Sequence, residues 1–151
     1  MRILMVCLGN ICRSPLAEGI MKHKAKLAGL DWHIDSAGTG SWHSGQLPDQ
    51  RSVQVAKKYG IDITDQRARQ FERDDFERFD RIFVMDTRNH QDVLRLANNS
   101  EDPAKVELIL NLCHPGENRS VPDPYLDDDG FEAVFQMLEN ACGTFVGRHR
   151  V

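Results

Sequence analysis

The sequence predicts a single α/β domain with a doubly wound parallel sheet and helices on both faces. Strand-like apolar segments alternate with amphipathic, helix-like segments along the whole chain, which is the pattern of parallel α/β proteins. The strand-like segments are short and apolar throughout, as in Ile-Phe-Val-Met at residues 82–85, which suits strands buried on both sides. A length of 151 residues fits one domain and requires no second one.

Two strand–helix units are predicted in the first half of the chain. Residues 3–7 form an apolar run that predicts a buried strand. Residues 16–28 predict a helix, because apolar residues recur at helical spacing after Pro15, which is favoured at a first helical position. The next apolar run covers residues 32–37 and is followed by an amphipathic segment at residues 52–59.

The second half of the chain repeats this alternation. Apolar runs at residues 81–85 and 106–110 predict two strands, and amphipathic segments at residues 89–97 and 131–146 predict two helices. Residues 114–130 are rich in Pro, Gly, Asn and Asp and predict a long loop. Loops of that length in compact domains are often functional, so this segment is a candidate contributor to a site.

The segment between the first strand and the first helix has the features of an anion-binding loop. It runs from Cys7 to Ser14 into a helix N-terminus, where unpaired N–H groups and the helix dipole attract an anion. Gly9 permits a tight, partly left-handed backbone, and Asn10 tolerates such dihedrals. Ligands of parallel sheets bind outside the carboxyl ends of the strands, which is where Cys7 lies. The loop therefore predicts a phosphate site that contains a cysteine.

Charge and composition argue against several classes of partner. The net charge of −4 comes without a basic cluster, so nucleic acid is not expected as a partner. The apolar runs are too short to cross a bilayer and the N-terminus lacks the features of a signal peptide, so we expect a cytoplasmic protein without membrane association. The four cysteines form no CxxC pair and are expected to be reduced, and no histidine pair has zinc-site spacing, so no metal or other cofactor is expected.

Five segments of the chain together match a known family. They are the first fifteen residues MRILMVCLGNICRSP, then Asp-Ser-Ala-Gly-Thr at residues 35–39, Arg-Ala-Arg-Gln at 67–70, Met-Asp at 85–86, and Val-Pro-Asp-Pro-Tyr at 121–125. The chain resembles the low-molecular-weight protein tyrosine phosphatases in these motifs and in its length. The resemblance implies one phosphatase domain over residues 1–151, with a four-stranded sheet in flavodoxin-like order.

Cys7 and Arg13 carry the chemistry that the loop supports. A cysteine among N–H groups at a helix N-terminus and beside an arginine is favoured as the nucleophilic thiolate. The planar guanidinium of Arg13 can grip two phosphate oxygens at once. The resemblance assigns to Ser14 a hydrogen bond to the thiolate and to Asn10 the bracing of the loop. The predicted phosphate-binding residues are Leu8, Gly9, Asn10, Ile11, Cys12, Arg13 and Ser14.

Asp123 is the predicted general acid and base. The leaving oxygen of a phosphate ester needs a proton, which a nearby carboxylic acid supplies and later recovers from water. Pro122 and Pro124 restrict the loop around Asp123. The resemblance selects Asp123 over the aspartates at residues 127–129, which spacing alone does not separate. Asp86 is expected to be structural support near the loop.

The walls of the predicted substrate cleft are Ile11, Trp42 and Tyr125. The two aromatic side chains are expected on loops, where they would flank a flat phenyl phosphate. Cys12 has two interpretations: a small buried apolar residue, or a resolving thiol that forms a disulfide with Cys7 after oxidation, as the resemblance suggests.

These residues predict a monomeric phosphatase that needs no cofactor and acts on tyrosine-phosphorylated proteins. An arsenate reductase of the same fold uses two further cysteines close together in the chain, and Cys113 and Cys142 are far apart. A phosphoarginine phosphatase of the same family has Thr where this chain has Ile11. A non-catalytic phosphopeptide-binding module is disfavoured because Cys7 and Asp123 are present together with Arg13 and Ser14.

Overall fold

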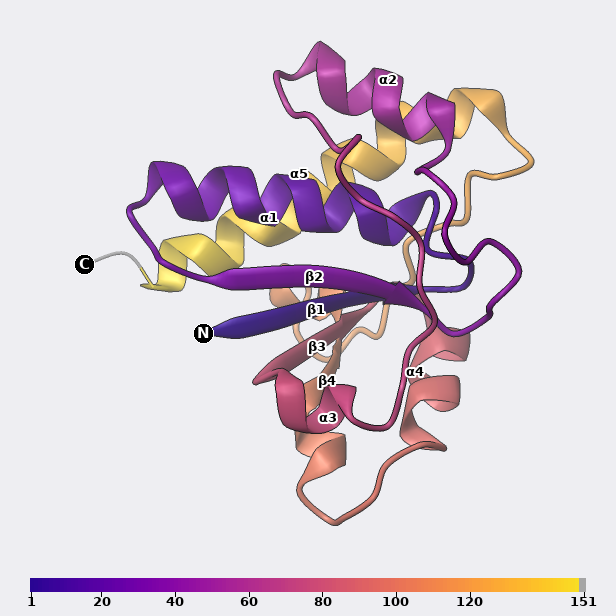
Figure 1. Ribbon diagram of the computed structural model, residues 1–151. Helices are drawn as coiled ribbons and strands as arrows, with labels where there is room; N and C mark the ends of the chain where they lie inside the picture. The colour runs from indigo at the N-terminus through magenta and orange to yellow at the C-terminus, as the bar shows by residue number, and fades with distance from the viewer. Residues whose placement is uncertain (150–151) are drawn as a thin grey trace.

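The computed structural model describes residues 1–149, which form a four-stranded sheet covered by helices on both faces (Figure 1). The strands are β1 (Arg2–Cys7), β2 (His33–Gly38), β3 (Arg81–Val84) and β4 (Val106–Leu108). The α-helices are α1 (Arg13–Leu27), α2 (Gln50–Lys58), α3 (Asp75–Arg78), α4 (Thr87–Leu94) and α5 (Phe131–His149). Short 3₁₀ helices cover Asp102–Lys105, Ile109–Leu112 and Asp128–Gly130.

All four strands are parallel and lie in the order β2-β1-β3-β4, which confirms the predicted fold class. Cys7 at the end of β1 pairs with Gly38 at the end of β2. On the other side of β1, Val6 pairs with Val84 at the end of β3. The carboxyl ends of these three strands therefore meet at one edge of the sheet, the place where parallel sheets bind ligands.

The central strand β1 contributes to two separate cores. Ile3 and Met5 pack in the core beneath α1, α2 and α5, and Leu4 and Val6 pack in the core that includes α3 and α4. Figure 1 shows α1 and α5 across one face of the sheet and α3 and α4 on the other. Because both faces of β1 are buried, its sequence is apolar without polar alternation.

Most predicted boundaries are off by one to three residues, and three further differences have a structural reason. Helix α1 begins at Arg13, so Pro15 takes the third helical position; the N–H groups of a first turn are unpaired, and proline loses nothing there. Strand β4 ends at Leu108, because the apolar residues of Ile109–Leu112 pack against α5 instead of extending the strand. Helix α3 was not predicted, since four residues are too few to show a helical period.

Helix α5, with 19 residues, closes the domain by packing along α1. Its buried side includes Phe135, Leu138 and Phe145, which complete the larger core. No helix within residues 1–149 has both the length and the apolar composition that a membrane crossing requires.

Candidate active site

A loop of residues 8–12 turns the chain from the end of β1 into α1. Asn10 takes the left-handed conformation, with φ of 56°, and its short polar side chain tolerates it. The prediction that Gly9 supplies the left-handed backbone is therefore wrong. A side chain at position 9 would crowd His43, because a Cβ there would lie 3.0 Å from Cδ2 of that ring.

The end of β2 packs directly against this loop. A Cβ on Gly38 would lie 2.8 Å from the carbonyl oxygen of Leu8 and 3.0 Å from the amide nitrogen of Asn10. The next amide, of Thr39, donates to the carbonyl oxygen of Cys7 at 2.9 Å. The absence of a side chain at Gly38 therefore lets two backbones meet, which fixes the position of the loop relative to the sheet.

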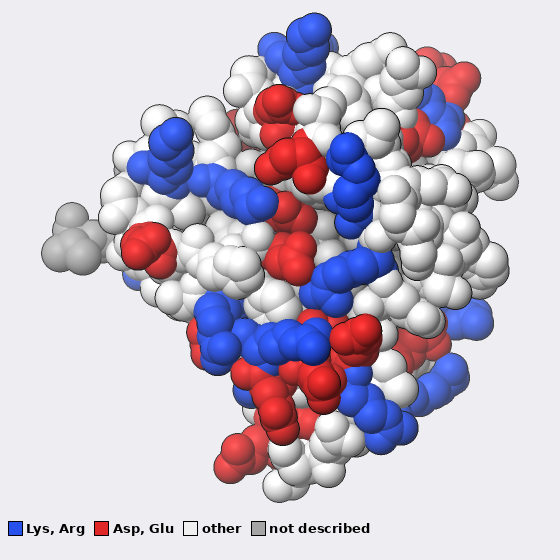
Figure 2. All heavy atoms as spheres, viewed as in Figure 1, with Lys and Arg blue, Asp and Glu red and all other residues white. Residues whose placement is uncertain are grey.

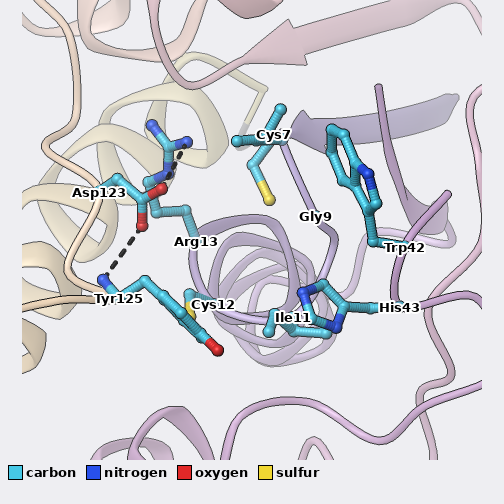
Figure 3. A pocket seen from close by; sticks show the side chains of 10 residues that line it. Cys7, Gly9, Ile11, Cys12, Arg13, Trp42, His43, Asp123 and Tyr125 are labelled. Carbon is cyan, nitrogen blue, oxygen red and sulfur yellow. Dashed lines mark hydrogen bonds and ion pairs between the residues drawn. The ribbon is translucent and has the colours of Figure 1, made fainter. Parts of the chain in front are cut away.

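The predicted catalytic and cleft residues lie around one cavity of about 210 Å³ (Figure 3). Its lining residues are Cys7, Leu8, Gly9, Ile11, Cys12, Arg13, Trp42, His43, Asp123 and Tyr125. Asn10 and Ser14 are absent from this lining because their side chains are buried behind the loop. The predicted phosphate-binding residues are therefore of two kinds, one facing the cavity and one supporting it.

Cys7 lies at the base of the cavity, and Figure 3 shows its sulfur directed into the open space. Its Sγ atom is 3.0 Å from the hydroxyl oxygen of Ser14. The same oxygen accepts a hydrogen bond from Nδ2 of Asn10 at 2.8 Å. A hydroxyl that already accepts one hydrogen bond has its proton available for the sulfur. This geometry agrees with the roles that the family resemblance implies for Ser14 and Asn10.

Arg13 is almost completely buried, with 3% of its side chain exposed. Its Nη1 atom donates to Oδ2 of Asp86 at 2.7 Å and to the carbonyl oxygen of Val121 at 3.0 Å. These two contacts orient the guanidinium plane and neutralise part of its charge. Asp86 thus has the supporting role that the sequence predicts, and it also caps α4 by accepting from the amide of Asn89.

Asp123 lies beside Arg13 on one side of the cavity (Figure 3). Its Oδ2 atom lies 3.7 Å from Nη2 of Arg13, and its Oδ1 atom accepts from the amide of Tyr125 at 3.1 Å. The carboxyl group is 44% exposed, so it can exchange protons with water. The loop is tied to the sheet by a hydrogen bond of 2.7 Å from the amide of Val121 to the carbonyl oxygen of Met85. A segment distant in sequence thereby brings a carboxyl group over the loop.

Two aromatic side chains flank the cavity. Figure 3 shows Trp42 and Tyr125 on opposite sides of it, with His43 at the rim. Trp42 is 69% exposed and Tyr125 is 46% exposed. The Trp42 ring lies over Gly40, where a Cβ would be only 1.8 Å from the ring. Both predicted wall residues therefore border the space that a substrate would occupy.

Arg51 supports the Tyr125 wall, and the sequence analysis missed it. Its guanidinium carbon lies 5.6 Å from the centre of the Tyr125 ring, within cation–π range. Asp49 and Asp128 hold it in place, with N···O distances of 2.9 Å and 2.5 Å. The Asp49 amide in turn donates to the carbonyl oxygen of Ile11 at 2.7 Å. Asp49 is close to Arg51 in sequence, but Asp128 and Tyr125 are distant, so no local motif relates Arg51 to the cavity.

Cys12 lines the cavity wall but has a strongly disfavoured thiolate. Burial raises the pKa of its thiol to about 12, and the nearby charges of Asp49, Cys7 and Asp123 act in the same direction. At neutral pH it is therefore a neutral thiol.

The other two cysteines are remote from the cavity lining. Cys142 is fully buried in the larger core, and Cys113 is half-buried against it. All four cysteines are free thiols. Within residues 1–149, no group of three or more His, Cys, Asp or Glu side chains is arranged to hold a metal ion.

Comparison with known proteins gives consistent matches along the chain. Residues 2–150 match the family model described as low molecular weight phosphotyrosine protein phosphatase. The chain is 44% identical to a protein of that name from Schizosaccharomyces pombe, over 96% of this chain and 94% of the relative. It is similar in structure to a protein tyrosine phosphatase from Entamoeba histolytica, with a TM-score of 0.91, 37% identity, and 99% and 96% of the two chains covered. It is also similar to a Drosophila arginine phosphatase, with a TM-score of 0.92, 33% identity, and 100% and 99% covered.

Proposed function

Since the chain belongs to the low molecular weight phosphotyrosine protein phosphatase family, we propose that it hydrolyses phosphotyrosine in proteins through a phosphocysteine intermediate on Cys7. One observation carries this proposal: Cys7 and Arg13, at the two ends of the loop after β1, and Asp123, from a segment distant in sequence, face the same cavity. A nucleophile, a bidentate cation and an exposed carboxyl group are the groups that two-step ester hydrolysis needs.

In the first step, the thiolate of Cys7 attacks the phosphorus atom. A sulfur–phosphorus bond forms as the bond between phosphorus and the tyrosine oxygen breaks. Protonated Asp123 gives its proton to the leaving phenolate, which departs as a neutral phenol. Arg13 and the amides of the loop hold the equatorial oxygens of the phosphoryl group.

In the second step, a water molecule attacks the phosphocysteine. The carboxylate of Asp123 takes a proton from that water, and a new phosphorus–oxygen bond forms. The sulfur–phosphorus bond breaks, inorganic phosphate leaves, and Cys7 returns as a thiolate. Electrons and protons balance over the two steps, so we propose that no cofactor takes part.

The shape and chemistry of the cavity favour phosphotyrosine over the other phosphorylated side chains. Cys7 lies at the base, so a phosphate on a long phenol reaches it more easily than one held close to a peptide backbone. Trp42 and Tyr125 can stack on a phenyl ring, which contributes about 0.5–1.5 kcal/mol beyond burial. Apolar Ile11 in the lining offers no hydrogen-bond acceptor to the guanidinium of a phosphoarginine. Ile11 therefore favours phosphotyrosine over phosphoarginine, whereas the similar Drosophila protein is named an arginine phosphatase.

A hydrolysis assay without added metal tests this proposal. Peptides carrying phosphotyrosine, phosphoserine or phosphoarginine are compared, with Cys7→Ser as the control. We expect efficient hydrolysis of the phosphotyrosine peptide alone and no turnover by Cys7→Ser, because a serine hydroxyl is not ionised at neutral pH. Substantial activity of that variant would contradict the covalent mechanism, and preference for phosphoarginine would change the substrate class.

We further propose reversible redox control through Cys12. Hydrogen peroxide transfers one oxygen atom to the thiolate of Cys7, giving a sulfenic acid, and hydroxide leaves. The sulfur of Cys12 then attacks that sulfur, a disulfide forms, and water leaves. The raised pKa of Cys12 supports this order of events, because the neutral thiol is the poorer target for peroxide.

We propose that residues 1–151 form one phosphatase domain that acts as a cytoplasmic monomer on phosphorylated proteins, and not on nucleic acid or membranes. Figure 2 shows basic and acidic side chains interspersed on the visible face, and the net charge is −4, which disfavours a polyanionic partner. A reducing compartment would keep the proposed nucleophile Cys7 in its reduced form.

A further inference from the structure

Glu18 is a buried carboxylate that the proposed mechanism does not use. It lies on α1 and is 3% exposed. Nζ of Lys22 donates to its Oε2 atom at 2.5 Å, and the hydroxyl of Ser36 donates to its Oε1 atom at 2.7 Å. Burial raises the pKa of Glu18, and the hydrogen bonds from Lys22 and Ser36 oppose that shift. Burying the Glu18 carboxylate costs desolvation free energy, which indicates that this residue has a role other than stabilising the fold.

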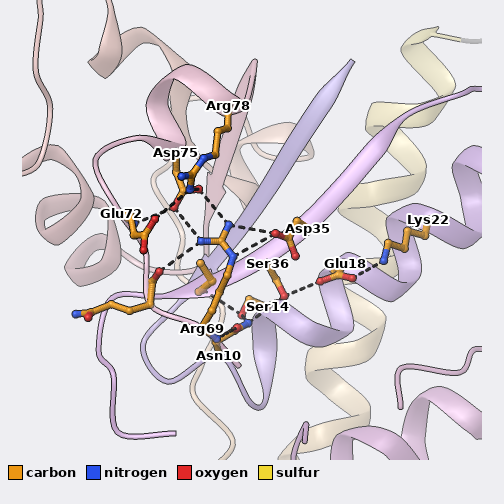
Figure 4. A network of polar contacts seen from close by, with 12 residues as sticks. Asn10, Ser14, Glu18, Lys22, Asp35, Ser36, Arg69, Glu72, Asp75 and Arg78 are labelled. Atoms are coloured by element: carbon orange, nitrogen blue, oxygen red, sulfur yellow. Dashed lines mark hydrogen bonds and ion pairs between the residues drawn. The ribbon is translucent and has the colours of Figure 1, made fainter. Parts of the chain in front are cut away.

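The contacts of Glu18 continue through Ser36 and Asn10 to Ser14 (Figure 4), which in turn contacts Cys7. Nδ2 of Asn10 donates to the hydroxyl oxygen of Ser36 at 3.0 Å and to that of Ser14 at 2.8 Å. The Ser14 oxygen is 3.0 Å from Sγ of Cys7. A buried relay therefore joins a carboxylate at one end to the proposed nucleophile at the other.

The chemistry of each group sets the direction of these hydrogen bonds. An ionised carboxylate only accepts, so the proton of Ser36 points to Glu18 and a lone pair faces Asn10. An amide nitrogen only donates, so Ser14 accepts from Asn10 and keeps its own proton free. That proton has two acceptors within reach, Sγ of Cys7 at 3.0 Å and the carbonyl oxygen of Ala37 at 3.5 Å. The thiolate is the closer one and the charged one.

A second contact prevents the amide of Asn10 from turning over. The backbone N–H of Arg69 donates to Oδ1 of Asn10 at 3.0 Å. The Arg69 side chain is held by Asp75, which is fully buried, and by Asp35, at 3.0 Å and 3.1 Å. Asn10 is therefore oriented from one side by Arg69 and from the other by Ser36.

We infer that Glu18 is a positioning residue for the phosphatase reaction: by accepting the Ser36 proton it keeps Asn10 donating to Ser14, whose own proton is then directed at Cys7. Glu18 does not line the cavity and does not touch substrate. The inference rests on the proposed role of Cys7 as nucleophile. The expected effect of Glu18 is to stabilise the thiolate of Cys7 through the Ser14 hydrogen bond. That thiolate is the nucleophile of the first step and the leaving group of the second.

Lys22 explains why an amide cannot replace this carboxylate. A lysine ammonium has only donors, so Glu18→Gln must turn its single oxygen towards Lys22. The amide nitrogen of the variant then faces Ser36 and donates to its hydroxyl oxygen instead of accepting from it. The Ser36 proton loses its acceptor, and Asn10 then keeps only one of the two contacts that orient it, the one from Arg69.

The test measures p-nitrophenyl phosphate hydrolysis together with the pH dependence of Cys7 alkylation by iodoacetamide. For Glu18→Gln we expect kcat to fall about tenfold, the worth of one hydrogen bond to a charged group, with a smaller change in KM. The midpoint of Cys7 alkylation should move to higher pH. The other titratable groups facing Cys7 are Arg13, Cys12, His43 and Asp123, and the variant leaves all of them in place.

Three further variants separate positioning from general loss of structure. Glu139→Gln removes a different carboxylate that pairs with a lysine of α1, at 3.7 Å from Lys24, and should change neither readout. Glu18→Gln/Lys22→Met frees the amide oxygen to accept from Ser36, so it should regain most of the kcat and return the alkylation midpoint. Ser36→Ala breaks the relay without touching the charge pair and should resemble Glu18→Gln, which keeps the test valid if Glu18→Gln does not fold.

The outcomes separate this inference from the proposed function. The positioning role would be overturned if Ser36→Ala kept the wild-type kcat and alkylation midpoint. It would also be overturned if the double variant recovered no more activity than Glu18→Gln has. In either case an inactive Cys7→Ser would still support the covalent mechanism. An active Cys7→Ser would instead remove the mechanism on which the inference rests.

Discussion

Arg13 uses different atoms for support and for the proposed binding of phosphate. Its Nη1 atom is occupied by Asp86 and the carbonyl oxygen of Val121, and Nη2 points to the side of the cavity where Asp123 lies. A lysine has one nitrogen and cannot make both sets of contacts. The precise orientation of a single side chain is therefore part of the site.

Arg13→Lys should reduce kcat/KM by about 10²–10³-fold, the usual effect of removing a group that stabilises transition-state charge. Steady-state kinetics with a phosphotyrosine peptide measure this loss. Thermal unfolding of the variant provides the control, because the ammonium group of the substituted side chain can still pair with Asp86. Activity close to wild type would place the phosphate clamp elsewhere.

Asp123→Asn removes the proton donor and preserves size and polarity. We expect kcat to fall by about 10²–10⁴-fold with a phosphotyrosine peptide, the usual contribution of general acid–base catalysis. The loss should be smaller with an aryl phosphate whose leaving group needs no proton. Equal losses with the two substrates would show that Asp123 is not the general acid.

Cys12→Ser should remain active before oxidation, because Cys12 has no part in either chemical step. After treatment with hydrogen peroxide and then a thiol reductant, wild type should recover its activity. The variant should recover poorly, since a sulfenic acid without a resolving thiol is oxidised further to irreversible forms. Equal recovery would leave Cys12 with the packing role alone.

At the scale of secondary-structure elements, the site depends on how closely β2 approaches the loop after β1. Gly38 ends β2, and both atoms that its Cβ would strike belong to the backbone of the loop. Backbone atoms cannot move aside as the tip of a flexible side chain can. The junction between strand and loop therefore restricts the residue at position 38 to glycine.

Gly38→Ala should displace the loop, lowering both the stability of the fold and the affinity for inorganic phosphate. Overpacking of this kind costs about 1–3 kcal/mol, which urea unfolding can measure. Gly147→Ala is the matched control, because a Cβ on Gly147 in α5 meets no atom within 4 Å. That variant should be stabilised by about 0.5–1 kcal/mol through its helix propensity. Unchanged stability and phosphate affinity in Gly38→Ala would contradict this account.

For the molecule as a whole, ion pairs join helices that are distant in sequence. Glu132 at the start of α5 accepts from Lys58 at 2.6 Å and from Tyr59 at 2.8 Å, both at the end of α2. Hydrogen bonds from Gln136, Lys58 and Tyr59 lower the pKa of Glu132 to about 2. The carboxylate therefore favours the folded state wherever it is ionised.

The sign of this linkage predicts acid destabilisation. Because the folded pKa lies below the unfolded value of about 4.3, the contribution of Glu132 is complete above that pH and is lost as the pH falls towards 2. Urea unfolding of wild type and Glu132→Gln at pH 7, 4 and 3 measures it. The free energies of unfolding of the two proteins should differ most at pH 7 and less at pH 3, where part of the difference remains because the folded pKa is lower still. A difference independent of pH would contradict this assignment.

The alternation of apolar and amphipathic segments was sufficient to predict the α/β class, and the family motifs predicted the order of the strands. Both depend on local pattern: a strand buried on two faces must be apolar throughout, and a loop that leads into a helix N-terminus attracts anions. The placement of Cys7, Arg13 and Asp123 around one cavity agrees with those motifs. The fold class and the anion-binding loop depend on residues that are neighbours in the chain, so the sequence is sufficient to predict them.

Tertiary structure alone decided the contacts between segments that are distant in sequence. The support of Tyr125 by Arg51, the approach of Gly38 to the loop, and the relay from Glu18 through Ser36 each join separate elements. Even inside the loop, only the structure shows that Asn10 takes the left-handed conformation and that Gly9 does not. Such contacts form only when the sheet has assembled, because hydrogen bonds and close packing act over a few ångströms and leave no periodic pattern along the chain.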